Sequence, residues 1–86
     1  MPEISRFYGI IIRMYFNDHN PPHFHAEYQG KKAEYNILSL ELLMGSLPSR
    51  ANALVLEWAA LHRAELLEDW ELARKMAELK SISGLD

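Results

Sequence analysis

The chain has 86 residues, of which 49% are hydrophobic and 24% are charged, and its formal net charge is −3. This length has room for one hydrophobic core, and the composition excludes a disordered chain. No apolar run approaches the roughly 18 residues of a membrane span, and the absence of cysteine excludes disulfides and thiolate metal sites. Because no secretory signal pattern opens the sequence, we expect a cytoplasmic protein.

Residues 1–46 predict a β-sheet. Strands are expected over residues 4–8 and over 10–16, the second being a β-branched and aromatic run. Residues 17–22 are rich in turn formers and separate this run from the next strand, 23–29. A two-residue turn at Gly30-Lys31 would join that strand to residues 32–37, and a short strand is expected over 42–44, closed by Gly45.

Residues 47–80 predict helix, starting at Pro48 or Ser49. Apolar residues recur near a 3.6-residue period, and His62 falls on this stripe, where a satisfied core role is expected. One straight helix of about 30 residues would be about 45 Å long, too long for one small domain, so a bend is expected near Glu65–Asp69. Residues 81–86 have neither period nor bulk and predict a flexible tail.

These elements predict a single α+β domain over residues 1–86, an antiparallel meander of three or four strands with the C-terminal helices packed on one face. Alternation assigns side chains to the two faces of the sheet. The covered face would carry Ile10, Ile12, Met14, Phe16, Phe24, Ala26, Tyr28, Ala33, Tyr35 and Ile37. The open face would carry Ile11, Arg13, Tyr15, His23, His25, Glu27, Lys32, Glu34 and Asn36.

The most informative segment holds three of the four histidines, His19, His23 and His25, around a double proline. Imidazole titrates nearest neutrality and is also the commonest metal ligand among side chains. Because residues two apart on a strand share a face, His23 and His25 should stand side by side and project into solvent.

One interpretation of this face is the cleavage of RNA. His23 and His25 would serve as acid and base, with His19 as a further member of the site. Arg13 would clamp a phosphate, Tyr15 would donate a hydrogen bond or stack on a base, and Glu27 would orient His25. The remaining cations that would steer the nucleic acid are Lys31, Lys32 and Arg50. The net negative charge limits such binding to a few phosphates.

A second interpretation is a metal site, in which His19 or Glu27 joins His23 and His25 around a divalent transition metal such as zinc. A third is that this strand is an ordinary solvated one, in which Arg13 pairs with Glu27 across the sheet and no cofactor is bound. The sequence leaves these alternatives open.

Three segments of the chain resemble a known family. They are residues 4–15, the segment Asp18-His19-Asn20-Pro21-Pro22-His23-Phe24-His25-Ala26, and the helical stretch from Leu56-Glu57-Trp58-Ala59 to Trp70-Glu71-Leu72-Ala73. Together they resemble a family of small, mostly bacterial proteins, domain-of-unknown-function family 4160, over about residues 2–80. The family's histidine motif maps onto His19, His23 and His25. Where the family often has a Thr-Gly turn, this chain has Leu38-Ser39-Leu40-Glu41-Leu42, which adds apolar groups that can serve an interface.

The resemblance implies the toxin component of a toxin–antitoxin-like pair, acting on RNA or translation, with a small antitoxin-like partner protein. The alternative function is a binding module without turnover. An edge strand can also pair two copies of the chain into a homo-oligomer.

Overall fold

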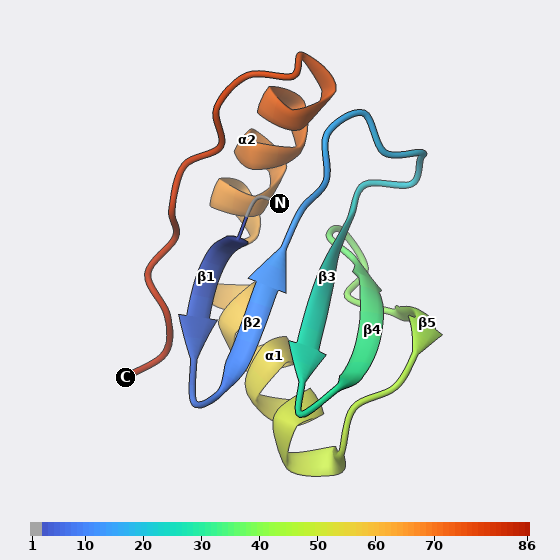
Figure 1. Cartoon of the computed structure of the whole chain (residues 1–86), viewed down its shortest axis with the longest axis vertical. Helices are drawn as coiled ribbons and strands as arrows, with labels where there is room; N and C mark the ends of the chain where they lie inside the picture. The colour runs from blue at the N-terminus through green and yellow to red at the C-terminus, as the bar shows by residue number, and fades with distance from the viewer. Residues whose placement is uncertain (1–2) are drawn as a thin grey trace.

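A computed structural model describes residues 3–86, so the first two residues of the predicted sheet half lie outside it. Residues 3–86 form five strands and two helices: β1 (Glu3–Phe7), β2 (Ile10–Arg13), β3 (His23–Tyr28), β4 (Lys31–Asn36), β5 (Leu42–Gly45), α1 (Ser49–Leu61) and α2 (Arg63–Arg74). All neighbouring strands are antiparallel, in the order β1-β2-β3-β4-β5. Both helices lie against one face of this sheet (Figure 1). The predicted α+β class is confirmed, with five strands instead of three or four.

Two-residue turns set the register of the first and third hairpins. Tyr8-Gly9 has φ values of 51° and 81°, and Gln29-Gly30 has 49° and 81°. Left-handed backbone at both central residues is the signature of a type I′ turn, whose twist matches that of the strands. The predicted turn at Gly30-Lys31 is therefore wrong by one residue. Glycine occupies the second turn position in both hairpins, and Lys31 is already the first residue of β4, opposite Tyr28.

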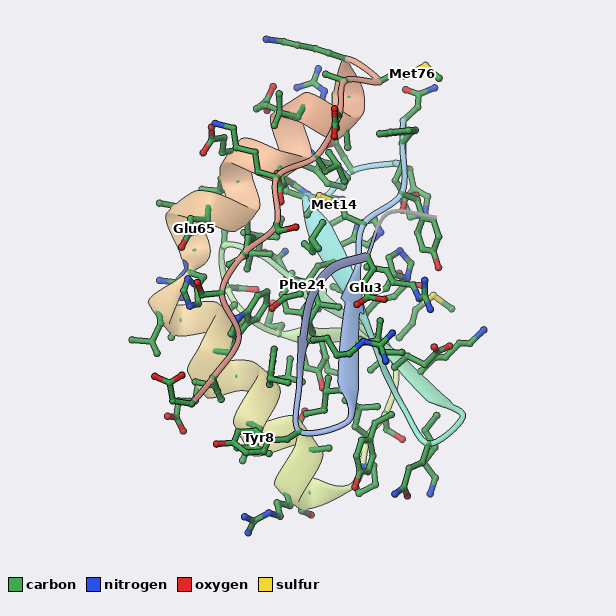
Figure 2. The ribbon with its side chains drawn as sticks, turned by 60° about the vertical axis from the view of Figure 1, so that its left-hand side comes forward. Glu3, Tyr8, Met14, Phe24, Glu65 and Met76 are labelled. Atoms are coloured by element: carbon green, nitrogen blue, oxygen red, sulfur yellow. The ribbon has the colours of Figure 1, made fainter. Side chains whose placement is uncertain are left out.

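The core lies between the sheet and the helices, and the labelled Phe24 and Met14 lie inside it (Figure 2). Eight of the ten residues predicted for the covered face are buried: Ile10, Ile12, Met14, Phe24, Ala26, Ala33, Tyr35 and Ile37. Tyr28 is only partly buried. Phe16 is 43% exposed, contrary to the prediction. Strand β2 ends at Arg13, so the alternation that placed Phe16 on the covered face no longer applies there.

The helical half differs from the prediction in two places. The break falls at His62, whose φ of −120° leaves the helical range, and not near Glu65–Asp69. The second helix ends at Arg74 and not near Lys80. Met76 adopts a left-handed conformation with φ 56°, and the amides of Met76 and Ala77 donate back to the carbonyls of Ala73 and Leu72. This is the Schellman arrangement, formed here without the usual glycine. Neither α1 nor α2, in the described part of the chain, has the length and apolar character that spanning a bilayer requires.

The C-terminal segment, predicted to be a flexible tail, packs along the outer edge of β1 (Figure 1). The amide of Ile82 donates to the carbonyl of Ile4 at 2.7 Å, and Trp58 Nε1 donates to the carbonyl of Ser83 at 2.7 Å. The side chain of Ile82 is buried with the core. Because both partners are far away in the sequence, local pattern gave no sign of this contact.

Replacing Ile82 with alanine should lower the free energy of unfolding by about 2–5 kcal/mol, the range for truncating a buried isoleucine. Chemical denaturation monitored by tryptophan fluorescence measures this change. Ser81→Ala, at the exposed neighbouring position, is the control and should change stability little. An unchanged denaturation midpoint for Ile82→Ala would show that the segment does not contribute to the core.

Asp69 should make stability depend on pH. Its Oδ1 accepts a hydrogen bond from the Lys80 amide at 2.9 Å, while Oδ2 is buried without a partner. Burial raises the pKa of Asp69, and the nearby charges of Glu68 and Glu65 raise it further. The hydrogen bond from the Lys80 amide and the Lys80 charge lower it, but the net shift is upward. The folded chain therefore binds this proton more tightly than the unfolded chain, whose value is about 3.9.

The stabilisation that this proton provides is complete below about pH 3.9 and is lost as pH rises through the folded-state pKa. Asp69→Asn keeps the acceptor but cannot titrate. The stability of the wild type relative to Asp69→Asn should thus fall as pH rises above about 3.9 and through the folded-state pKa, as denaturant titrations at several pH values would measure. Asp69→Ala, which leaves the Lys80 amide unpaired, should be destabilised by about 1–3 kcal/mol. A pH-independent difference between wild type and Asp69→Asn would contradict the assignment.

Candidate functional site

The loop between β2 and β3 passes over the end of the sheet at which β3 begins. The amide of Asn17 donates to the Ala73 carbonyl at 3.1 Å, which joins this loop to the end of α2. Pro21 and Pro22 fix two backbone φ angles just before β3. The loop is therefore held over the first residues of β3, where the histidines lie.

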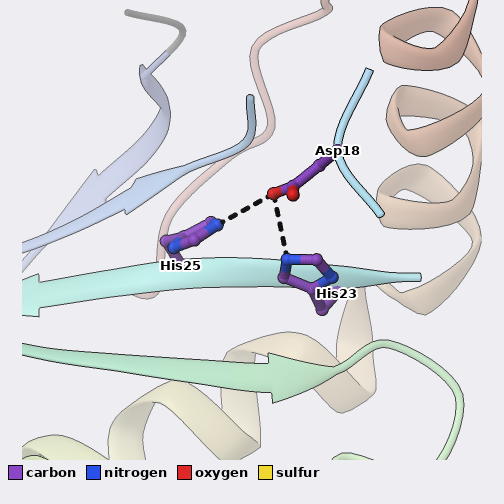
Figure 3. Close-up of side chains that lie close together, drawn as sticks. All are labelled: Asp18, His23 and His25. Carbon is purple, nitrogen blue, oxygen red and sulfur yellow. Dashed lines mark hydrogen bonds and ion pairs between the residues drawn. The ribbon is translucent and has the colours of Figure 1, made fainter. Parts of the chain in front are cut away.

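Asp18 in this loop and His23 and His25 on β3 form a cluster, which we call the Asp18–His23–His25 cluster (Figure 3). Asp18 Oδ2 lies 3.0 Å from His23 Nε2 and 3.3 Å from His25 Nε2. The two imidazole rings stand side by side with their centroids 5.2 Å apart, as residues two apart on a strand should.

The two histidines differ in exposure, which the sequence did not predict. The side chain of His23 is 1% exposed and that of His25 is 24% exposed. The ring of His23 packs 5.3 Å from the Trp70 ring of α2. The expectation that both imidazoles project into solvent is therefore correct only for His25, because His23 lies at the end of the sheet where the loop closes over it.

A hydrogen bond to the backbone fixes the His23 ring. Its Nδ1 lies 2.7 Å from the carbonyl oxygen of Pro21, which can only accept, so Nδ1 carries a proton and donates it. His23 Nε2 is buried and has no aligned hydrogen-bond partner, although Asp18 Oδ2 lies close to it. This nitrogen is the one unexplained polar atom of the cluster.

Sequence reasoning missed the roles of Asp18 and Glu34. Glu34 lies directly opposite His25 in the β3–β4 register, with its carboxylate oxygens 3.7 Å from His23 Nε2 and 3.8 Å from His25 Nδ1. The predicted open face already contained Glu34, so the register of the hairpin was the signal that could have paired it with His25. No strand pattern covers Asp18, which the fold of the loop alone brings to the histidines.

The Asp18 carboxylate is held in its charged form. Its partial burial alone would raise its pKa, but the His19 amide, 2.9 Å from Oδ1, the hydrogen bond with His25 and the charges of His23 and His19 together lower the pKa below its ordinary value. The cluster thus contains a fixed negative charge beside two imidazoles at neutral pH.

Beside the cluster, the open face carries a shallow depression lined by Arg13, Tyr15, His25, Ala26, Glu27 and Lys32. Arg13 lies opposite His25 in the β2–β3 register, and the Tyr15 ring makes an edge contact with the His25 ring at 4.6 Å. Glu27, predicted to orient His25, instead lies 3.6 Å from the Arg13 guanidinium and 3.9 Å from Lys32 Nζ. His25 is thus part of both the cluster and the depression.

The other predicted site residues lie elsewhere. His19 is 80% exposed at its side chain, with Nε2 3.7 Å from Asp18 Oδ1. Arg50 lines a separate cavity of about 280 Å³ with Tyr8, Tyr28 and Leu54, and Lys31 lies opposite Tyr28 beside the hairpin turn. Of the four cations predicted to bind nucleic acid, only Arg13 and Lys32 therefore line the depression with His25.

His62 remains separate from these histidines. It lies at the helix break, partly buried, with its ring 5.5 Å from Trp58 and its Nδ1 2.5 Å from Glu65 Oε1. These contacts agree with the structural role predicted for it.

Comparison with known proteins gives the family of the chain but no activity. Residues 9–71 match the family described as a domain of unknown function, DUF4160. The chain matches no curated protein and no solved structure. The matched range contains β2 to β5, the Asp18–His23–His25 cluster and most of both helices. The chain therefore belongs to the DUF4160 family of domains of unknown function.

Proposed function

We propose that this protein acts on RNA through the open face of its sheet, as the effector of a toxin–antitoxin-like pair. The observation that carries the proposal is the depression in which Arg13, Tyr15, His25 and Lys32 meet. Two cations, an aromatic ring and an imidazole are the groups that a phosphate, a base and a reacting hydroxyl require.

The phosphate would bind beside Arg13. A guanidinium offers a planar pair of donors to phosphate oxygens and stabilises charge that develops on them. Its pairing with Glu27 is loose, at 3.6 Å and partly exposed, so an incoming phosphate competes with a weak interaction. With only Arg13 and Lys32 at this place and a net charge of −3, the protein would bind a short single-stranded segment and not a long duplex.

The accessible imidazoles would carry the proton transfers. Cleavage at a 2′-hydroxyl needs one group that accepts its proton and one that protonates the leaving 5′ oxygen. His25 and His19 lie on the two oxygens of the Asp18 carboxylate, and both reach solvent. Buried His23 cannot touch a substrate, so its part is to position Asp18 and His25.

Single-stranded RNA incubated with the purified protein should be cleaved, and Arg13→Ala and His25→Ala should each slow cleavage at least about 100-fold, the lower range for a lost acid–base or charge-stabilising group. Gel analysis of end-labelled RNA measures the rate. Lys75→Ala removes an exposed cation at the end of α2 and is the matched control. Intact RNA after incubation with wild type, or equal toxicity of wild type and His25→Ala in cells, would contradict the proposal.

A binding function is favoured by one further observation, the free edge of β5. Within the described residues 3–86, strand β5 pairs with β4 alone, and Leu42, Leu43 and Met44 are 48%, 39% and 63% exposed. An apolar edge strand invites strand addition by another chain. Met44 also lines a hollow with His25 and Glu34, so a small partner protein added to β5 would cover the proposed site.

Leu43→Lys should abolish retention of a stoichiometric small partner when the tagged protein is purified from its own cells, because a lysine on an edge strand opposes strand addition. Met76→Lys changes an equally apolar but distant exposed side chain and should retain the partner. Mass spectrometry identifies the retained protein. Light scattering of the pure protein measures whether it forms a dimer. A dimer that is lost in Leu43→Lys would show that a second copy of the chain, and not a different protein, occupies the β5 edge. Retention by both variants would exclude the β5 edge.

A further inference from the structure

We propose that Asp18, His23 and His25 bind a divalent transition-metal ion. The ligand atoms would be Asp18 Oδ2, His23 Nε2 and His25 Nε2, which all lie within 4.8 Å of one another. The inference does not depend on the proposed action on RNA, because two of its three ligands, Asp18 and His23, do not line the depression.

The two distances between the carboxylate oxygen and the imidazole nitrogens match metal coordination, and the third pair of atoms lies within 4.8 Å. Ligands about 2.0–2.1 Å from a zinc-like ion are separated by about 3.0 Å in octahedral geometry and about 3.4 Å in tetrahedral geometry. The carboxylate oxygen lies 3.0 Å from one imidazole nitrogen and 3.3 Å from the other. Two imidazoles and one carboxylate suit zinc, iron(II), cobalt(II) or nickel(II), and they leave coordination positions open for water or a substrate.

The strongest support is the unexplained nitrogen of His23. Because Nδ1 donates to the Pro21 carbonyl, Nε2 is the ring nitrogen that is left to bind a metal, through the lone pair of the neutral ring. Nε2 lies 3.0 Å from the charged Asp18 Oδ2, and the His23 side chain is 1% exposed to water. The pair lacks the alignment of a hydrogen bond, so this buried nitrogen has no hydrogen-bond partner among the described residues. A cation between Nε2 and Oδ2 satisfies both atoms.

The surroundings have the form of an outer shell around a metal. Metal-bound histidines commonly donate their second nitrogen to a carbonyl, as His23 does to Pro21. The other oxygen of Asp18 accepts the His19 amide, which leaves Oδ2 directed at the histidines. Glu34 adds a second negative charge 3.7–3.8 Å from the two imidazoles. Two carboxylates in contact with the two imidazoles attract a doubly charged cation.

This ligand set differs from the metal site predicted from the sequence, in which His19 or Glu27 joined His23 and His25. His19 lies on the far oxygen of Asp18, with most of its side chain in solvent, and Glu27 pairs with Arg13 and Lys32. Asp18 therefore takes the third ligand position, for which the sequence analysis named His19 or Glu27. The double proline contributes by fixing the loop that holds Asp18 over β3.

Metal binding is tested on the full chain after treatment with a chelator and dialysis. Titration with Zn²⁺ by calorimetry should give one ion per chain, and Co²⁺ should give a visible absorption band and a raised thermal midpoint. Asp18→Asn, which conserves shape, and His25→Ala, at a partly exposed position, should each weaken binding at least about tenfold. Circular dichroism confirms that both variants are folded.

Two control variants make the test specific. His62→Ala removes a histidine that is also paired with a carboxylate, and His19→Ala removes the third ligand of the alternative set. Both should bind Zn²⁺ as the wild type does. Absence of saturable binding by the wild type, or wild-type affinity in Asp18→Asn and His25→Ala, would overturn the proposal. The binding measurements contain no RNA, so they test the metal site alone. RNA cleavage in excess chelator would support the RNA proposal without the metal, and metal binding without cleavage would support the metal site alone.

Discussion

The register of β3 within the sheet connects the core of this protein to its histidines. Phe24 and Ala26 are buried under the helices, and the Phe24 ring lies 5.4 Å from that of Tyr35 and 5.9 Å from that of Trp58. Because neighbouring residues on a strand face opposite sides, this packing forces His23 and His25 onto the other face. A slip of one residue would turn Phe24 and Ala26 out of the core and move both imidazoles to the opposite face, so the stability of the core holds the site in place.

The loop before β3 then divides the histidines into two environments. It covers His23 and brings Asp18 to both rings, while His25 remains at the rim, where it also meets Arg13 and Tyr15. A group of carboxylates and imidazoles around buried His23 thus adjoins a group of cations and an aromatic ring. The first group forms the proposed metal site and the second forms the proposed RNA site, and His25 belongs to both.

The two edges of the sheet differ in whether another segment of the chain covers them. The edge of β1 is covered by the C-terminal segment, which is anchored by Ile82 and by the hydrogen bond from Trp58. The edge of β5 presents Leu42, Leu43 and Met44 to solvent. Natural sheets usually protect a free edge with charge, proline or a covering segment, so this difference favours β5 as the edge at which another chain would add.

The sequence by itself determined the α+β class, most of the covered face of the sheet and the pairing of His23 with His25, because these follow from periods of two and 3.6 residues along the chain. The tertiary structure decided what those periods do not encode. The burial of His23, the arrival of Asp18, the end of α2 at Arg74 and the packing of Ile82 all depend on partners distant in sequence. The periodicity of the sequence predicts which face of a strand or helix a residue lies on. Whether that residue is buried, and which side chains it contacts, depends on segments that are distant in sequence and pack against that face.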